Sequence, residues 1–177
     1  MTVVSFTSTP DLVDAFYDEA LVVEAGLFDF GGNKKFYGEI QTVYCFEDST
    51  QVAACLDDDG TGKVLVVDGG ASLRMALTGD QVMSRGLANG WQGVIINGCV
   101  RDWPIVRELQ IGVKALAPHP GKRIRRGEGK RNVPVNFKGV TFLPGDYIFC
   151  DESGIVVLPR AVAIQQIEEI KILLSGA

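Results

Sequence analysis

Two neighbouring charged residues, Arg101 and Asp102, follow directly after the apolar run GVIINGCV. A charged pair at the end of a buried segment must be solvated, paired or coordinated to a metal ion, because an isolated buried charge is costly. Arginine offers planar N–H donors to a carboxylate or enolate oxygen. Aspartate is a natural oxygen ligand for magnesium or manganese. The alternative is a salt bridge that only closes the end of a strand.

A second candidate is the segment Gly79-Asp80-Gln81-Val82, at the start of an expected helix. A helix start presents backbone N–H groups without intrahelical partners and the positive end of the helix dipole, which together suit a carboxylate or phosphate. Gly79 would let an anion approach the backbone closely. The alternative is that Asp80 only caps the helix.

The elements that would position these residues alternate between helices and strands before residue 118, and strands dominate from residue 133. We expect strands at 37–46, 63–68, 93–100 and 113–117, and helices at 9–21, 49–56, 72–77, 81–88, 104–109 and 160–174. Thr9 is expected to cap the first helix. This order predicts one layered α/β domain over residues 1–177, with a mixed sheet or two sheets. Both candidates then fall at strand ends, where the loops of such folds surround a crevice.

The composition limits the class of protein. The chain has 177 residues, 46% of them hydrophobic, and a net charge of −5, which argues against direct, general nucleic-acid binding. The N-terminal residues do not resemble a signal peptide, and no apolar stretch approaches the roughly 20 residues that span a membrane. We therefore expect a soluble, cytoplasmic protein. Its four cysteines show no CxxC spacing, which predicts buried reduced thiols.

Two further features have structural alternatives. His119, the only histidine, stands between two prolines, which favours a structural role over a catalytic one. Six basic residues crowd into the segment 122–131, which could guide anionic substrates or contact a partner, or could form a solvated loop. These six are Lys122, Arg123, Arg125, Arg126, Lys130 and Arg131.

The spacing from Asp80 to Arg101-Asp102, inside VVDGGASLRMALTGDQV and GWQGVIINGCVRD, resembles the RraA-like family. The similarity continues through IGVKALAPHP and NVPVNFKGVTFLPGDYIFCDESGIVVLP, so it spans most of the chain. That family includes proteins named regulator of ribonuclease E activity A. It also includes 4-hydroxy-4-methyl-2-oxoglutarate aldolases with oxaloacetate decarboxylase activity.

The resemblance implies a single layered β/β/α swivelling-type domain that forms a homotrimer, with sites near the subunit contacts. It also implies that the turn Gly79, Asp80, Gln81 and Val82 binds substrate, that Arg101 binds substrate, and that Asp102 binds the metal. The aldolase members use a divalent cation, usually Mg²⁺ or Mn²⁺. Some ribonuclease-regulating members depart from the aspartate after the arginine, whereas this chain keeps it.

The resulting hypothesis is a metal-dependent lyase acting on a small 2-keto acid, with Asp80 and Arg101 as catalytic residues. The backbone of the turn would hold the substrate carboxylate, Arg101 and the cation would stabilise a pyruvate enolate, and Asp80 could position a water for proton transfer. The alternative from another class is a non-enzymatic regulator that binds and inhibits a ribonuclease E-type enzyme, or binds a helicase. Some members were once labelled menaquinone methyltransferases, but Gly69-Gly70 lacks the GxGxxG pattern.

Overall fold

The computed structural model describes residues 7–121 and 125–164. The helices are α1 (Thr9–Ala15), α2 (Thr50–Leu56), α3 (Asp80–Ala88) and α4 (Trp103–Val106). The strands are β1 (Leu21–Val22), β2 (Phe28–Asp29), β3 (Phe36–Tyr44), β4 (Lys63–Asp68), β5 (Ala76–Thr78), β6 (Gly93–Val100), β7 (Gly112–Pro118), β8 (Lys130–Arg131), β9 (Val135–Phe137), β10 (Val140–Phe142), β11 (Tyr147–Cys150) and β12 (Ile155–Leu158). Residues 160–164 are also helical, and the rest of the expected helix 160–174 lies outside the described residues.

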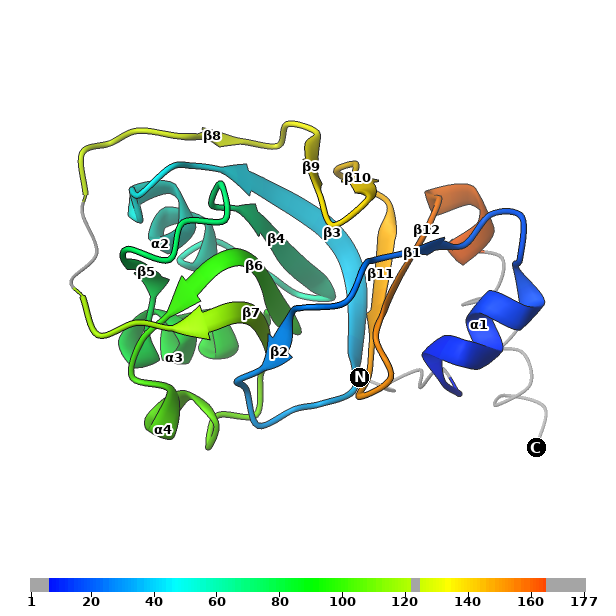
Figure 1. Ribbon diagram of the computed structural model, residues 1–177, viewed down its shortest axis with the longest axis horizontal. Coiled ribbons are helices and arrows are strands. Elements are labelled where there is room, and N and C mark those ends of the chain that lie inside the picture. The colour runs from blue at the N-terminus through cyan, green and yellow to red at the C-terminus, as the bar shows by residue number, and fades with distance from the viewer. Residues whose placement is uncertain (1–6, 122–124, 165–177) are drawn as a thin grey trace.

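A mixed sheet forms the centre of the molecule (Figure 1). Its strand order is β1-β12-β11-β3-β4-β6-β7-β2, with β5 paired to β6 and β8 paired to β3. The pairs β3–β4, β4–β6, β5–β6 and β6–β7 are parallel, whereas the flanking pairs are antiparallel. The carboxyl ends of the parallel strands therefore meet at one edge, as expected for the predicted α/β class.

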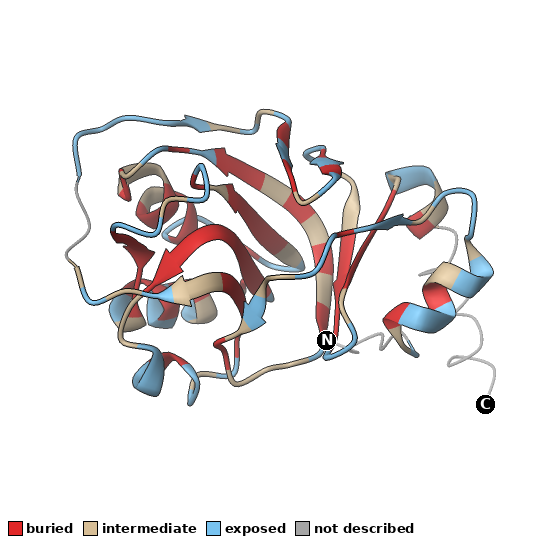
Figure 2. Ribbon diagram, viewed as in Figure 1, coloured by how far each residue is buried: buried red, intermediate tan, exposed pale blue. Residues whose placement is uncertain are grey.

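The central parallel strands are buried on both faces of the sheet, because other elements cover each face (Figure 2). Alternate residues point to opposite faces: Leu65 and Ile96 pack in a cluster with α2 and α3, while Val66 and Ile95 pack with the β9–β10 hairpin and the β11–β12 pair. A third, smaller cluster joins α1 to β12.

The two edge strands β1 and β2 lie at opposite ends of the strand order, yet only residues 23–27 separate them. Such a short link reaches at most about 20 Å. The sheet must therefore curl until its two edges approach each other, as the chain between β1 and β2 shows in Figure 1. We call the gap between these edges the seam.

Three local predictions were wrong. The helix expected at 9–21 ends at Ala15, and Leu21 belongs to β1. The expected helix 72–77 is instead an irregular segment that leads into β5, because Ala76 and Thr78 pair with β6 in the sheet. The N-cap of α1 is Ser8, whose hydroxyl accepts a hydrogen bond from the Asp11 N–H, while Thr9 donates to Asp151. Within the described residues, no helix is both long and apolar enough to cross a bilayer.

Candidate active site

The structure brings the two candidate segments together at the carboxyl edge of the sheet. Strands β5 and β6 run parallel with Thr78 opposite Val100, so the residues after each strand are neighbours. The Arg101 N–H donates to the Thr78 carbonyl at 3.0 Å, which ties the two strand ends together. Asp80 and Arg101, which are 21 positions apart in sequence, thus lie in neighbouring segments because of the β5–β6 register.

Arg101 and Asp102 form an ion pair, with 2.8 Å between Arg101 Nε and Asp102 Oδ2. Consecutive side chains in a strand point to opposite faces, so an extended backbone would keep them apart. Asp102 instead has φ 55° and ψ 30°, the left-handed conformation, and its carbonyl then accepts hydrogen bonds from the Ile105 and Val106 N–H groups of α4. Such a conformation costs about 1–3 kcal/mol in non-glycine residues and is concentrated at functional sites. The side chains are 31% and 33% exposed, so a ligand can reach both.

Gly79 lies directly against this pair. A Cβ atom at residue 79 would be 2.8 Å from Arg101 Cγ and 2.9 Å from Asp102 Oδ2. Both distances are shorter than carbon and oxygen atoms tolerate without moving. The backbone of Gly79 is extended, with φ −158°, so the glycine is needed here for close approach rather than for backbone conformation.

Helix α3 starts beside the ion pair, with Gly79 as its N-cap and Asp80 as its first residue. The structure therefore does not support a role for Asp80 as the capping residue. The first N–H groups of a helix have no intrahelical acceptor, so the N–H groups of Asp80, Gln81 and Val82 can serve an anion. The Val82 side chain is 1% exposed and packs in the core, which leaves only its backbone for this task.

The Arg101–Asp102 ion pair leaves some donor and acceptor atoms of both side chains available to a ligand. Arg101 uses Nε for Asp102, so its two terminal amino groups can still donate to a ligand. Asp102 keeps its second oxygen, Oδ1. In the part of the chain that the structure describes, no three His, Cys, Asp or Glu side chains cluster as a metal cage. The residues fit a cation such as Mg²⁺ that keeps several waters and takes one or two carboxylates, not a cation enclosed by protein ligands.

The described part of the basic segment is anchored by a buried carboxylate. Asp48 accepts N–H hydrogen bonds from Thr50 (2.8 Å), Arg126 (2.7 Å) and Glu128 (3.1 Å). Burial alone would raise the pKa of Asp48, but the bonds from Thr50, Glu128 and Arg126 outweigh it and lower the pKa to about 2. Residues 125–128 are thus held near the strand ends, and a functional role for the basic patch stays a prediction.

His119 makes two hydrogen bonds with neighbouring backbone groups. Its backbone N–H donates to the Val100 carbonyl at 2.9 Å, and its ring Nδ1 accepts from the Gly121 backbone N–H at 2.9 Å. These bonds fix the turn after β7, in keeping with the predicted structural role. All four cysteines are buried and free, as expected.

Sequence reasoning missed Thr78, whose carbonyl aligns Arg101, because nothing in a sequence reports strand register. It also missed the strain at this edge. Glu47, Ala71 and Asp102 all have positive φ without being glycine, and they follow β3, β4 and β6 respectively. Backbone strain at three neighbouring strand ends supports this edge as the functional one.

A curled mixed sheet that presents a strained Arg–Asp pair to the start of a helix defines a class of protein: a layered α/β protein with a polar strand-end site. A family profile described as RraA-like, Aldolase/RraA, matches residues 9–157. The chain belongs to the RraA-like family. The fold prediction that rested on this resemblance is confirmed by solved structures.

The relatives carry several names. A protein of Stutzerimonas stutzeri (strain A1501), provisionally named 4-hydroxy-4-methyl-2-oxoglutarate aldolase, is 52% identical over 89% of this chain and 98% of its own length. A solved structure titled RNA-processing inhibitor RraA, from Thermus thermophilis, has a TM-score of 0.84 and 40% identity, covering 87% of this chain and 93% of that one. Another, titled S-adenosylmethionine:2-dimethylmenaquinone methyltransferase from Geobacillus kaustophilus HTA426, has a TM-score of 0.85 and 41% identity, covering 87% and 96%.

Proposed function

We propose that this protein is a divalent-metal-dependent carbon–carbon lyase that acts on small 2-keto acids, as a 4-hydroxy-4-methyl-2-oxoglutarate aldolase and oxaloacetate decarboxylase. The observation that carries the proposal is the Arg101–Asp102 pair packed against Gly79 at the start of α3. A second line of support is the aldolase name of relatives that are 49–52% identical over nearly their whole length.

Each group has a task in this proposal. The backbone N–H groups of Asp80, Gln81 and Val82 bind the substrate carboxylate beside the 2-keto group. Arg101, oriented by Asp102, donates from its terminal amino groups to the keto oxygen as it gains enolate charge. Asp80, at the first position of α3, positions the water that delivers or removes the proton at the carbon. Asp102 would hold Mg²⁺ or Mn²⁺, and such a cation supplies Lewis acidity towards the keto oxygen.

The test is pyruvate release from oxaloacetate and from 4-hydroxy-4-methyl-2-oxoglutarate, with Mg²⁺, with Mn²⁺ and after EDTA treatment. We expect activity with metal, loss in EDTA, and a fall in kcat of about 10³-fold in Asp102→Asn. The matched control is Glu108→Gln, because Arg107 and Glu108 form a second adjacent ion pair, at 3.1 Å, that is exposed and lies just after α4. Full activity in Asp102→Asn, or activity that ignores EDTA, contradicts the metal assignment.

A second candidate function is binding and inhibition of a ribonuclease E-type enzyme, or binding of a helicase. The specific support is the 40% identity to the structure titled RNA-processing inhibitor RraA. Capture of a purified ribonuclease E-type enzyme, with slower RNA cleavage and no turnover of any tested 2-keto acid, would favour this function. The net charge of −5 supports a protein partner rather than direct nucleic-acid binding.

We also propose a cytoplasmic homotrimer. Four large apolar side chains close to the strand-end edge are 40–56% exposed in the single chain, which supports coverage by another subunit. They are Phe46, Leu73, Trp103 and Ile105. The four free cysteines support a reducing compartment.

A further inference from the structure

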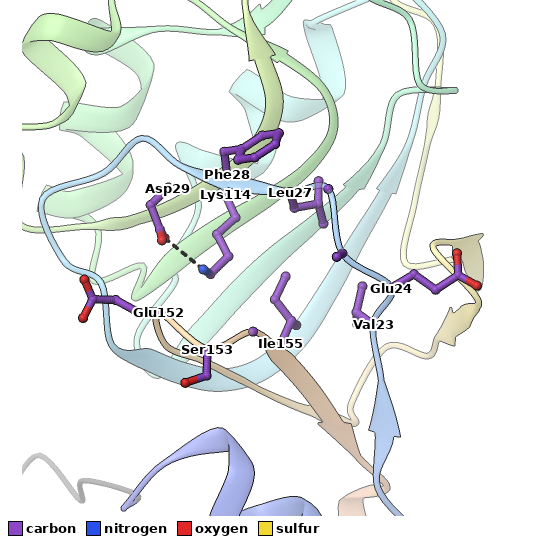
Figure 3. Close-up of a pocket in the computed structure, with 12 residues that line it drawn as sticks. Val23, Glu24, Leu27, Phe28, Asp29, Lys114, Glu152, Ser153 and Ile155 are labelled. Atoms are coloured by element: carbon purple, nitrogen blue, oxygen red, sulfur yellow. Dashed lines mark ion pairs between the residues drawn. The ribbon is translucent and has the colours of Figure 1, made fainter.

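A cavity of about 290 Å³ lies in the seam, away from the strand-end residues of the proposed lyase site. Its walls come from residues 23–29, which join β1 to β2 and include β2, and from residues 152–155 at the turn between β11 and β12 (Figure 3). Since a water molecule takes about 30 Å³ in the liquid, the cavity has room for about ten waters or for one small organic molecule.

A buried lysine forms one end of this cavity. Lys114 pairs with Ile95 in the β6–β7 register, so it shares the sheet face that packs against the β9–β10 hairpin, among apolar residues. Its side chain is only 4% exposed. Lys114 Nζ lies 2.9 Å from Asp29 Oδ1 and donates to the Asp151 carbonyl at 2.9 Å. An ammonium group has three N–H donors, and the Asp151 carbonyl takes one of them, so donors remain for a ligand.

The partner of Lys114 is incompletely satisfied as well. Asp29 Oδ1 is buried and, among the described residues, receives no hydrogen bond of good geometry; its contact with Lys114 is a charge attraction only. The charged atoms of Asp29 and Lys114 lie 2.9 Å apart at the cavity (Figure 3). The carboxylate can still accept a hydrogen bond and the ammonium group can still donate one, so both are available to a ligand. Leaving such buried groups without partners is unfavourable.

The rest of the lining is mixed: Glu24, Glu152 and Ser153 are polar, whereas Val23, Leu27 and Ile155 are apolar. Val23 and Ile155 are 7% and 5% exposed and belong to the apolar cluster of this face, and Leu27 packs against the same cluster. The Glu24 carboxylate lies against Gly139 in the β9–β10 turn rather than over Lys114, as Figure 3 also shows. A ligand must therefore combine a short apolar body with one charge of each sign.

We infer that the seam cavity binds a free α-amino acid with an aliphatic side chain. Its ammonium group would donate to Asp29 Oδ1, its carboxylate would accept from Lys114 Nζ, and its side chain would contact Val23, Leu27 and Ile155. The α-ammonium and α-carboxylate groups of an amino acid are adjacent, which matches the adjacent charges of the Lys114–Asp29 pair. Neither an amine nor a carboxylic acid alone satisfies both protein groups.

The test is calorimetric titration of the full chain with L-leucine and with two analogues that each lack one charge. These analogues are 3-methylbutylamine, without the carboxylate, and 4-methylpentanoate, without the ammonium group. We expect L-leucine to bind with a Kd below about 10 mM and each analogue to bind at least about tenfold more weakly. No binding of L-leucine, or equal binding of either analogue, overturns the inference and leaves a cavity filled only by water.

Two variants separate binding from folding. Gly154 lines the cavity, a Cβ there would meet no atom within 4 Å, and its φ is not in the left-handed region, so Gly154→Leu should fold while it adds bulk at the cavity wall. We expect this variant to keep its thermal unfolding midpoint and to lose L-leucine affinity about tenfold or more. Lys114→Met should also lose binding. Because it removes one partner of a buried ion pair, it also destabilises the fold, so Gly154→Leu is the decisive variant. Unchanged affinity in a folded Gly154→Leu protein overturns the inference, whatever the lyase assays show.

Discussion

At the scale of single residues, the geometry of the candidate site depends on the backbone of Asp102. Its left-handed conformation places two consecutive side chains on the same side of the strand end, where a regular strand would separate them. Arg101 is oriented by this contact before any ligand arrives, so little side-chain entropy remains to be lost on binding. Orientation of the guanidinium, more than its charge, is what the pair contributes.

Replacing Arg101 by lysine tests this orientation. A lysine keeps the charge but has one ammonium group, which cannot pair with Asp102 and present two further amino groups in a fixed plane. We expect Arg101→Lys to lower kcat/KM for oxaloacetate about 10²-fold. The matched control is Arg107→Lys at the C-cap of α4; this arginine is 54% exposed and pairs with the neighbouring Glu108. Full activity in Arg101→Lys would show that charge alone suffices.

Gly79→Ala tests the close approach at the same site. The added methyl group would be 2.8 Å from Arg101 Cγ and 2.9 Å from Asp102 Oδ2, so the ion pair must shift. We expect kcat/KM to fall between about 10- and 100-fold, because small misplacements of catalytic groups are expensive. Thermal stability should change little, since the extended backbone at residue 79 suits alanine. Ser84→Ala, on the exposed face of α3, is the control, and equal activity in both variants would contradict the packing argument.

At the scale of elements, the segment after β7 shows how one carboxylate can fix a polar chain segment. Asp48 is fully buried and accepts hydrogen bonds from backbone N–H groups on both sides of Gly127. The bonds are to a charged acceptor, which makes each of them stronger than a neutral bond. These hydrogen bonds hold the basic residues 125 and 126 near the strand-end edge, although both residues are exposed.

Asp48→Asn should release this segment. We expect a loss of about 2 kcal/mol in the free energy of unfolding at pH 7, and faster trypsin cleavage after Arg125 and Arg126. The pKa of Asp48 is lowered in the folded protein to about 2, so its contribution is complete above its unfolded value near 3.8 and is lost as the pH falls towards 2. The stability difference between the two proteins, measured by urea unfolding, should therefore shrink below pH 4.

Asp14→Asn, at an exposed position of α1, is the control for the loss of one negative charge. It should leave both stability and cleavage unchanged. A constant stability difference between pH 7 and pH 2.5 would show that the Asp48 carboxylate is not the group that holds the segment.

At the scale of the whole molecule, the curl of the sheet creates two separate regions of interest. The carboxyl edge of the parallel strands gathers the candidate lyase site, while the seam between β1 and β2 encloses the Lys114 cavity. Lys114 also joins the two sides of the seam, because its ammonium group reaches from β7 to the Asp151 carbonyl before β12. A single curled sheet thus positions both of the proposed sites, which differ in their chemistry.

The proposed trimer belongs to this scale. Sedimentation equilibrium should give a mass about three times the 19.1 kDa of one chain, independent of loading concentration. Replacing Ile105, which is 54% exposed, by lysine should lower that mass if the apolar side chains near the strand ends are covered by another subunit. A monomer at micromolar concentration would contradict the proposal.

The sequence by itself determined the α/β class, the buried strands 63–68 and 93–100, and the candidates at residues 79–82 and 101–102. These features depend on local pattern: runs of apolar residues, and charged residues or glycine at their ends. The family resemblance added the fold that the solved structures confirm. The lysine inside the apolar run GVKALA was a visible signal, but it could not reveal its partners.

Only the tertiary structure decided which distant residues meet. Residues 72–77 have a local preference that suggests a helix, yet β6 offered hydrogen bonds to β5 and tertiary pairing prevailed. The contact of Gly79 with the ion pair, the seam, and the placement of Lys114 beside Asp29 all depend on strand register and on the curl of the sheet. Register is set by the sum of many long-range contacts, and that sum cannot be read from any single segment.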